Sequence, residues 1–281
     1  MRERSPARRK LTDLLVRIVS LLAALFGLFI LGWILYVIMA RGVGAINWAF
    51  FTELPAPPGM MGGGLANAIV GTLLITVLAS LIGIPLGLLT GVYLAEFGGQ
   101  SRLAEAIRFC SNLLMGTPSI IVGVFVYGLI VVPLGDFSAW AGAVALAIIM
   151  LPVVARTTEE MLNLVPDSLR EAALGLGTPR WKTTLQILFR AAGSGLVTGI
   201  LLAVARVSGE TAPLLFTSLN SPFWFETLNE PIGNLTVTIF NYAMSPYADW
   251  QAKAWGASLL ITLGVLGATL LARTTLWMRR K

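Results

Sequence analysis

Two charged residues stand alone in a long apolar stretch, and their chemistry suits an anion. Across residues 191–225, only Arg206 and Glu210 are charged. Their i, i+4 spacing places them on one face of a helix, beside Gly209 and Thr211. A charge within hydrocarbon costs about 2.5–3.5 kcal/mol on insertion scales and usually faces a protein interior or a cavity. Because a planar guanidinium donates paired hydrogen bonds to oxyanions, we predict a substrate pathway at these four residues. The alternative is an ion pair that only fixes helix packing.

The residue types exclude most enzymatic sites. The chain of 281 residues has no histidine and one cysteine, Cys110. An internal disulfide and a Cys/His metal site are therefore excluded, as are Ser-His-Asp and Cys-His catalysis. The chain also lacks the Gly-x-x-x-x-Gly-Lys-Ser/Thr phosphate loop of nucleotide-binding proteins. We expect no catalytic residue, no metal and no cofactor bound by this chain.

A second functional candidate is a short polar helix between two apolar segments. Ser168 and Glu171 have the spacing of a capping box, with Ser168 as the N-cap. Gly177 is expected to stop the helix, and Thr178 with Pro179 to start another. The apolar face carries small and aliphatic side chains: Leu169, Ala172, Ala173 and Leu176. A helix this short is marginal alone in water, so we predict that it docks into a groove on a partner. An interfacial amphipathic helix is the alternative.

Long apolar spans must position both candidates. The chain is 56% hydrophobic and 12% charged, with a mean hydropathy of +0.81, whereas soluble domains carry about 25% charged residues. We predict an all-α polytopic membrane protein with six spans, at about 18–40, 67–95, 113–133, 138–155, 187–209 and 255–277. They form one transmembrane domain (18–277) between a basic N-terminal segment (1–17) and a tail (278–281). The docking helix lies in a loop at 156–186, and outer loops lie at 41–66 and 211–254.

The distribution of positive charge predicts the orientation. All but three of the 20 basic residues lie in segments that the six spans place on the same side of the membrane as the N-terminus. The exceptions are Arg41, Arg206 and Lys253. Basic residues favour cytoplasmic loops, so both termini are predicted to be cytoplasmic. The basic balance thus reflects membrane topology and not nucleic-acid binding. The apolar segment 235–240 is too short to span and is predicted to be interfacial or re-entrant.

Glycines and prolines within the spans predict close packing and breaks. Glycines spaced by four residues let helix backbones approach in lipid, and they form two series: Gly83, Gly87 and Gly91, then Gly195 and Gly199. Pro85, and Gly116 with Pro118, can interrupt helical hydrogen bonding, which is tolerated beside a neighbouring helix or a cavity. These breaks favour a moving pathway over a static anchor.

Arg156, Glu159 and Glu160 lie where the fourth span is expected to end. We predict a possible gating role for Arg156 and Glu160, the alternative being snorkelling with local ion pairing. Weaker pathway candidates lie in the second span: Asn67, Thr72, and Tyr93 with Glu96.

Several strings resemble a known transporter family. Glu171-Ala172-Ala173, followed by Gly177 and Ile187, resembles the EAA loop of ABC importer permeases, although Phe189 and Arg190 replace the family's leucine and proline. The segments 156–161, 165–173, 205–215, 116–120 and 241–243 resemble the PstA-type branch of phosphate importer permeases.

The resemblance implies a type I ABC importer permease in the inner membrane, moving inorganic phosphate from periplasm to cytoplasm by alternating access. The EAA helix would couple the spans to a separate ATPase through Ser168, Glu171, Ala172, Ala173 and Gly177. The implied partners are a related second permease, two ATP-binding subunits that carry ATP-Mg, and an extracytoplasmic phosphate-binding protein.

Other functions fit less well. The residues alone leave sulfate, molybdate or a phosphonate open as cargo. An ion-coupled secondary transporter should carry acidic residues in its spans and often an inverted repeat, whereas Glu210 is nearly the only acidic candidate. A membrane scaffold gives no reason for a charged pair within a span, and a membrane enzyme lacks an acid–base set.

Overall fold

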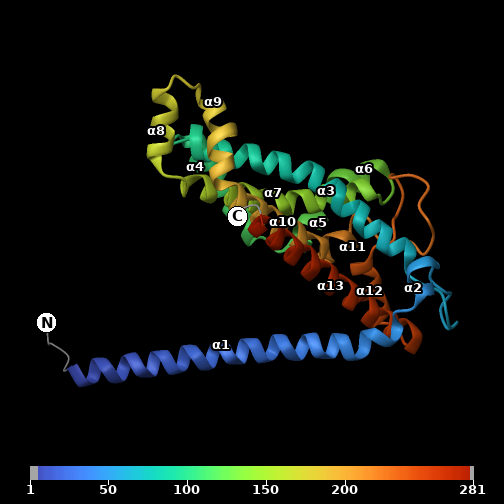
Figure 1. Cartoon of the computed structure of the whole chain (residues 1–281). Helices are drawn as coiled ribbons and strands as arrows, with labels where there is room; N and C mark the ends of the chain where they lie inside the picture. The colour runs from blue at the N-terminus through green and yellow to red at the C-terminus, as the bar shows by residue number, and fades with distance from the viewer. Residues whose placement is uncertain (1–5, 279–281) are drawn as a thin grey trace.

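The protein is all-helical, as predicted. The computed structural model describes residues 6–278, so most of the predicted tail (278–281) and the start of the basic segment (1–17) lie outside the described residues. Figure 1 shows a bundle of helices from which α1 projects. The α-helices are α1 (Pro6–Gly42), α2 (Trp48–Thr52), α3 (Ala66–Val92), α4 (Arg102–Gly116), α5 (Ser119–Val126), α6 (Val132–Leu134), α7 (Ala139–Asn163), α8 (Asp167–Gly175), α9 (Arg180–Thr183), α10 (Phe189–Ser208), α11 (Ala212–Leu215), α12 (Leu235–Ala243) and α13 (Ala248–Met278). One 3₁₀ turn, η1 (Val43–Ala45), and three π turns, η2 (Tyr93–Phe97), η3 (Tyr127–Val131) and η4 (Thr184–Leu188), join them.

Five of the described helical segments are long and apolar enough to cross a bilayer. A sixth crossing results if α4 and the segment α5–η3–α6 are counted together, although their axes are bent by 104°. The third predicted span (113–133) therefore begins inside α4 and crosses this bend. Other spans extend beyond their predicted bounds as well: α7 reaches Asn163, and α9, η4 and α10 form one helical segment over Arg180–Ser208. Arg190 stands there in place of a proline, whose ring would disrupt a helix interior.

The core is centred on α7, which packs between α3 and α10. The predicted glycine series lie in these contacts. A Cβ on Gly91 of α3 would lie 2.5 Å from the Cβ of Thr158, and one on Gly199 of α10 would lie 2.1 Å from Cγ2 of Thr157. Since Cβ atoms do not approach neighbours this closely, only glycine permits these helix separations.

The two proline-containing positions behave differently. α3 continues through Pro85 without a break. At Gly116 and Pro118, however, α4 ends and α5 begins in a new direction. The predicted interruption is therefore real at the second position alone.

The end of the bundle that holds α2 and α12 is tightly hydrogen-bonded. The predicted short element at 235–240 is α12, and the Asn234 side chain caps it by accepting from the Val237 amide at 2.9 Å. Lys253 of α13, which is buried, pairs with Asp249 at 2.7 Å and also donates to the Gly62 carbonyl. The predicted outer loop 41–66 is thereby fixed to α13 through Gly62, and α12 is capped within the predicted outer loop 211–254.

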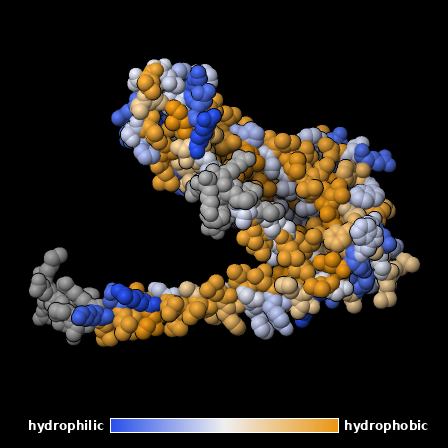
Figure 2. Space-filling view, viewed as in Figure 1, coloured by the Kyte–Doolittle hydropathy of each residue, from blue (hydrophilic) through white to orange (hydrophobic). Residues whose placement is uncertain are grey.

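The first helix stands apart from the body. α1 contacts the rest mainly where its last residues meet α13, with Gly42 against Trp255 and the Arg41 guanidinium 5.2 Å from the Trp255 ring centroid. Figure 2 shows apolar side chains along most of α1 and over the middle of the body. The apolar window of α1 is wholly unburied, so its sides are free to contact lipid or another chain.

Candidate pathway cavity and docking helix

A cavity of about 200 Å³ lies at the bend between α4 and α5. Thr117 and Pro118 are extended, with ψ of 132° and 131°, so the chain leaves α4 and re-enters a helix at Ser119. The side chains around the cavity come from four helices and the bend: Leu114, Met115, Thr117, Pro118, Ser119, Ile149, Val153, Arg206 and Glu210. The bend therefore makes room beside the last turn of α10.

The two predicted charges lie side by side on one wall of this cavity without a hydrogen bond between them. Nε of Arg206 lies 3.9 Å from Oε1 of Glu210, and their side chains are 56% and 19% exposed. The backbone of Glu210 is fixed, because its carbonyl accepts from the Thr236 hydroxyl of α12 at 3.0 Å. The backbone at Glu210 is thus held in place, while no hydrogen bond is described for the guanidinium of Arg206.

The other two predicted pathway residues do not line the cavity. Gly209 is the C-cap of α10, and Thr211 precedes α11. Thr117 and Ser119 line the cavity instead, although sequence reasoning did not assign them to the pathway. The break at Gly116 and Pro118 was the available signal for them.

The cavity combines groups that favour a small anion. Arg206 supplies a delocalised positive charge and Ser119 supplies a hydroxyl group, whereas the Thr117 hydroxyl already donates to the Leu113 carbonyl at 2.7 Å. The first backbone amides of an α-helix lack intrahelical acceptors and point toward its N-terminal end, and α5 begins at Ser119. A bound oxyanion would meet all three kinds of donor.

The predicted docking helix is α8, but it does not begin as predicted. Its N-cap is Pro166, without a side-chain hydrogen bond, and Ser168 lies inside the first turn. The capping-box prediction is wrong because Pro166, which is extended at φ −57° and ψ 140°, already directs the chain into the helix. Asp167 then places a carboxylate in the first turn, where the helix dipole favours it. The next helix likewise begins at Arg180 with Pro179 as N-cap, so Thr178 is not a cap.

The end of α8 agrees with the prediction. Gly177 has φ +77°, a conformation that glycine adopts readily. The Gly177 amide donates to the Leu174 carbonyl at 2.9 Å, and the Thr178 amide donates to the Ala173 carbonyl at 3.1 Å. This pair of bonds is the Schellman motif.

α8 presents an apolar face to the surroundings. Leu169 and Leu176 are 41% and 87% exposed, and Ala172 and Glu171 are exposed as well. Ala173 alone of the predicted docking residues is buried. Most of the predicted face is therefore available to a partner.

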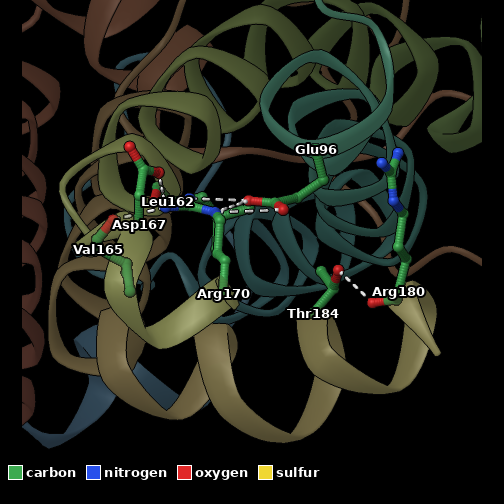
Figure 3. A network of polar contacts seen from close by, with 7 residues as sticks. All are labelled: Glu96, Leu162, Val165, Asp167, Arg170, Arg180 and Thr184. Atoms are coloured by element: carbon green, nitrogen blue, oxygen red, sulfur yellow. Dashed lines mark hydrogen bonds and ion pairs between the residues drawn. The ribbon is translucent and has the colours of Figure 1, made fainter. Parts of the chain in front are cut away.

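Arg170 of α8 holds this helix to the rest of the bundle (Figure 3). Its Nη2 lies 2.9 Å from Oε1 of Glu96 and 2.6 Å from the Leu162 carbonyl oxygen. Its Nη1 donates to the Val165 carbonyl at 2.6 Å and to Asp167 at 3.1 Å. The hydrogen bond to the Glu96 carboxylate raises the pKa of Arg170 above its ordinary value. Glu96, predicted as a weak pathway candidate, instead binds α8 to the end of α3.

A second buried ion pair lies close by, and it revises the expected role of Glu159. Nε of Arg108 in α4 lies 2.7 Å from Oε1 of Glu159 in α7, whose side chain is 8% exposed. Arg108 also donates to the Leu94 carbonyl at 3.1 Å. Arg156 pairs with Glu160 at 2.6 Å, and both side chains are about half exposed. The predicted gating pair is therefore a local surface contact, whereas Glu159 joins two helices.

Comparison with known families is consistent with this architecture. The sequence profile of a family described as "Binding-protein-dependent transport system inner membrane component" matches residues 83–275. The "Phosphate transport system permease protein PstA" of Yersinia pestis is 52% identical over 97% of this chain and 92% of the relative. Its counterpart in Haemophilus influenzae is 48% identical over 94% of each chain.

Solved structures share the fold at lower identity. A chain of the inward-facing MetNI methionine ABC transporter superposes with a TM-score of 0.63 at 22% identity, covering 75% of this chain and 94% of that chain. A crystal structure of an amino acid ABC transporter with histidines gives 0.56 at 18% identity, covering 77% and 92%. At these identities the likeness concerns the fold alone.

Proposed function

Since the chain belongs to the family of binding-protein-dependent transport system inner membrane components, and within it to the PstA phosphate transport permeases, we propose that it is the membrane-spanning permease subunit of an ATP-driven importer of inorganic phosphate. It is a multi-pass protein of the inner membrane. The observation that carries this assignment is the loose Arg206–Glu210 pair on the cavity at the helix bend.

Phosphate would bind to the guanidinium of Arg206, beside the carboxylate of Glu210. At 3.9 Å the pair makes no hydrogen bond, so an arriving oxyanion gains donors without first breaking one. The guanidinium of Arg206 would bind two phosphate oxygens through its fork, with the Ser119 hydroxyl as a further donor. Glu210, which repels the anion, would limit its residence so that release follows binding.

Energy for transport would come from another subunit through α8. The chain carries no phosphate loop of its own, and the exposed face of α8 includes Glu171, Ala172 and Leu176. We assign this face to docking on an ATP-binding subunit that holds ATP-Mg, with two such subunits per importer. The α8 end of the bundle then lies in the cytoplasm, together with both termini.

Two further partners complete the importer. The free apolar sides of α1 fit a related second permease within the membrane. An extracytoplasmic phosphate-binding protein would dock at the opposite end of the bundle, on the outer loops 41–66 and 211–254, which are ordered by α2, α12 and Lys253.

Phosphate uptake by proteoliposomes tests this function. They would contain the chain with its second permease, ATPase and binding protein, and sulfate and molybdate would serve as competitors. We expect ATP-dependent uptake of labelled phosphate that resists both competitors. Transport of another oxyanion would retain the importer and change its cargo, whereas uptake by the chain alone, driven by an ion gradient, would overturn the assignment.

A further inference from the structure

α8 is attached to the bundle in two different ways. By backbone proximity it packs on α9 and on the π turn η4, which lead directly into α10. Toward α3 and α7, in contrast, the hydrogen bonds and ion pairs described for α8 all come from the side chain of Arg170.

The Arg170 side chain is well suited to transmit movement. Its side chain is 18% exposed and that of Glu96 is 13% exposed, so water screens the pair little. Its bonds to the Leu162 and Val165 carbonyls fix it at the end of α7 as well as at the end of α3. A guanidinium can hold several acceptors in a fixed fork, which a lysine ammonium cannot.

Of the helices whose ends Arg170 reaches, α7 lines the pathway cavity directly and is joined to α4, which lines it as well. α7 contributes Ile149 and Val153, which lie about 14–20 Å along the helix from Leu162 at 1.5 Å per residue. The Arg108–Glu159 pair connects α7 to α4, which contributes Leu114 and Met115. The opposite wall, which contains Arg206 and Glu210, lies at the end of α10. One wall is thus reached from α8 through Arg170 and the other through α9 and η4.

We propose that Arg170 is a positioning residue for transport: through Glu96 and the end of α7 it moves the α4–α7 wall of the cavity when α8 moves, so that both walls move in one ATPase cycle. This inference rests on the proposed function. Without the Arg170 contacts, α8 would be joined to α7 only by the short connection 164–166 and would lose its link to α3, so that ATP would be hydrolysed with less phosphate transported.

The space around Arg170 allows truncation without collapse. A polar cavity of about 520 Å³ lies beside it, bounded by α8, α9 and the ends of α3 and α7, and lined by Ala95, Glu96, Asn163, Asp167, Arg170, Leu174, Arg180 and Thr183. Figure 3 shows Arg180 near the Arg170 network; the bond drawn to it runs from the Thr184 hydroxyl to its backbone carbonyl, and none is drawn to its guanidinium. Water can therefore hydrate the groups that a shorter side chain leaves behind.

The test measures phosphate molecules transported per ATP hydrolysed by the purified, fully assembled importer. Arg170→Gln is expected to lower this ratio about tenfold, within the range by which residues along a coupling network alter coupling. Glu96→Gln should lower it similarly, and the double variant should be no worse than either single one, because both remove the same link. Asp167→Asn is the matched control: it removes an exposed contact to the same guanidinium and should leave the ratio unchanged.

The outcomes separate this inference from the proposed function. If the unaltered importer shows no ATP-dependent phosphate uptake, the proposed function fails. If it transports and assembled Arg170→Gln keeps the normal ratio, the role of Arg170 is refuted. If Arg170→Gln does not assemble, the ratio of phosphate transported to ATP hydrolysed is measured in Arg170→Lys and Glu96→Gln instead. A normal ratio in both of these variants also refutes the role of Arg170.

Discussion

The ion pairs at the α8 end and the ion pair in the pathway cavity are built from the same residue types with opposite geometries. At the α8 end, Arg108 and Arg170 lie 2.7 and 2.9 Å from largely buried carboxylates. In the cavity, Arg206 stands 3.9 Å from Glu210 with more than half of its side chain exposed. The first two arginines also donate to backbone carbonyls, whereas Arg206 has no such bond among those described.

This difference distinguishes arginines that hold the helices together from an arginine that can bind a ligand. An arginine whose donors all have acceptors inside the protein has nothing left for a ligand, and removing its partner leaves a buried charge. An arginine with a distant counter-ion and open donors contributes little to stability and can bind an anion. Stability and transport should therefore respond to different substitutions in these two regions.

The largest expected effect is on transport, at Arg206. Arg206→Gln should lower phosphate uptake about 100-fold, because two charge-assisted hydrogen bonds together contribute about 3 kcal/mol. The free energy of unfolding should stay nearly unchanged. Uptake in proteoliposomes and denaturation in detergent measure the two quantities, with Arg17→Gln, at an exposed arginine of α1, as the control. A loss of stability that matches the loss of uptake would make the pair merely structural.

Glu159 should show the opposite response. Breaking a buried ion pair costs about 3–5 kcal/mol, and the 30% exposure of Arg108 reduces our expectation for Glu159→Gln to about 2 kcal/mol of unfolding free energy. Denaturant titration of the purified chain measures it. A loss of unfolding free energy no larger than that caused by breaking the exposed Arg156–Glu160 pair would show that the two regions do not differ in this way.

The exposed face of α8 should affect coupling and leave folding unchanged. Glu171→Lys reverses a charge on the proposed ATPase interface, and like-charge contact across an interface is strongly unfavourable. We expect uptake to fall at least about tenfold while the chain still inserts and ATP hydrolysis continues. Gly177→Pro, which destroys the Schellman turn, should act in the same direction. Normal uptake in both variants would disprove docking through α8.

The smallest effect is expected at the surface pair Arg156–Glu160. Both side chains are about half exposed, so Arg156→Gln should change the free energy of unfolding by about 0.5 kcal/mol or less and uptake by about twofold or less. The same two assays measure it. A larger fall in uptake at unchanged stability would support the gating role predicted for this pair.

Local sequence patterns predicted most of the elements. Hydropathy located the long helices, glycine spacing located the α3–α7 and α7–α10 contacts, and Gly177 located the end of α8. Arg206 and Glu210 were found because they are isolated charges four residues apart. Each of these signals lies within one helix or turn, which is why the sequence alone revealed it.

Long-range pairing was not predictable in this way. Arg108 and Glu159 are separated by 51 positions, and Arg170 and Glu96 by 74. Nothing local distinguishes Arg170 from the other basic residues of its loop. The start of α8 was wrong for a related reason, since Ser168 matched a capping pattern that Pro166 made unnecessary.

The uninterrupted helix from Arg180 to Ser208 acts as a lever. It packs against Thr157 of α7 at Gly199, about 29 Å along the helix from Arg180 but only about 10 Å from Arg206 at 1.5 Å per residue. A rotation about that fulcrum reduces a displacement at the α9 end roughly threefold by the time it reaches the guanidinium. A movement that the proposed ATPase imposes at α9 would thereby be scaled down toward the shorter distances over which hydrogen bonds are made and released.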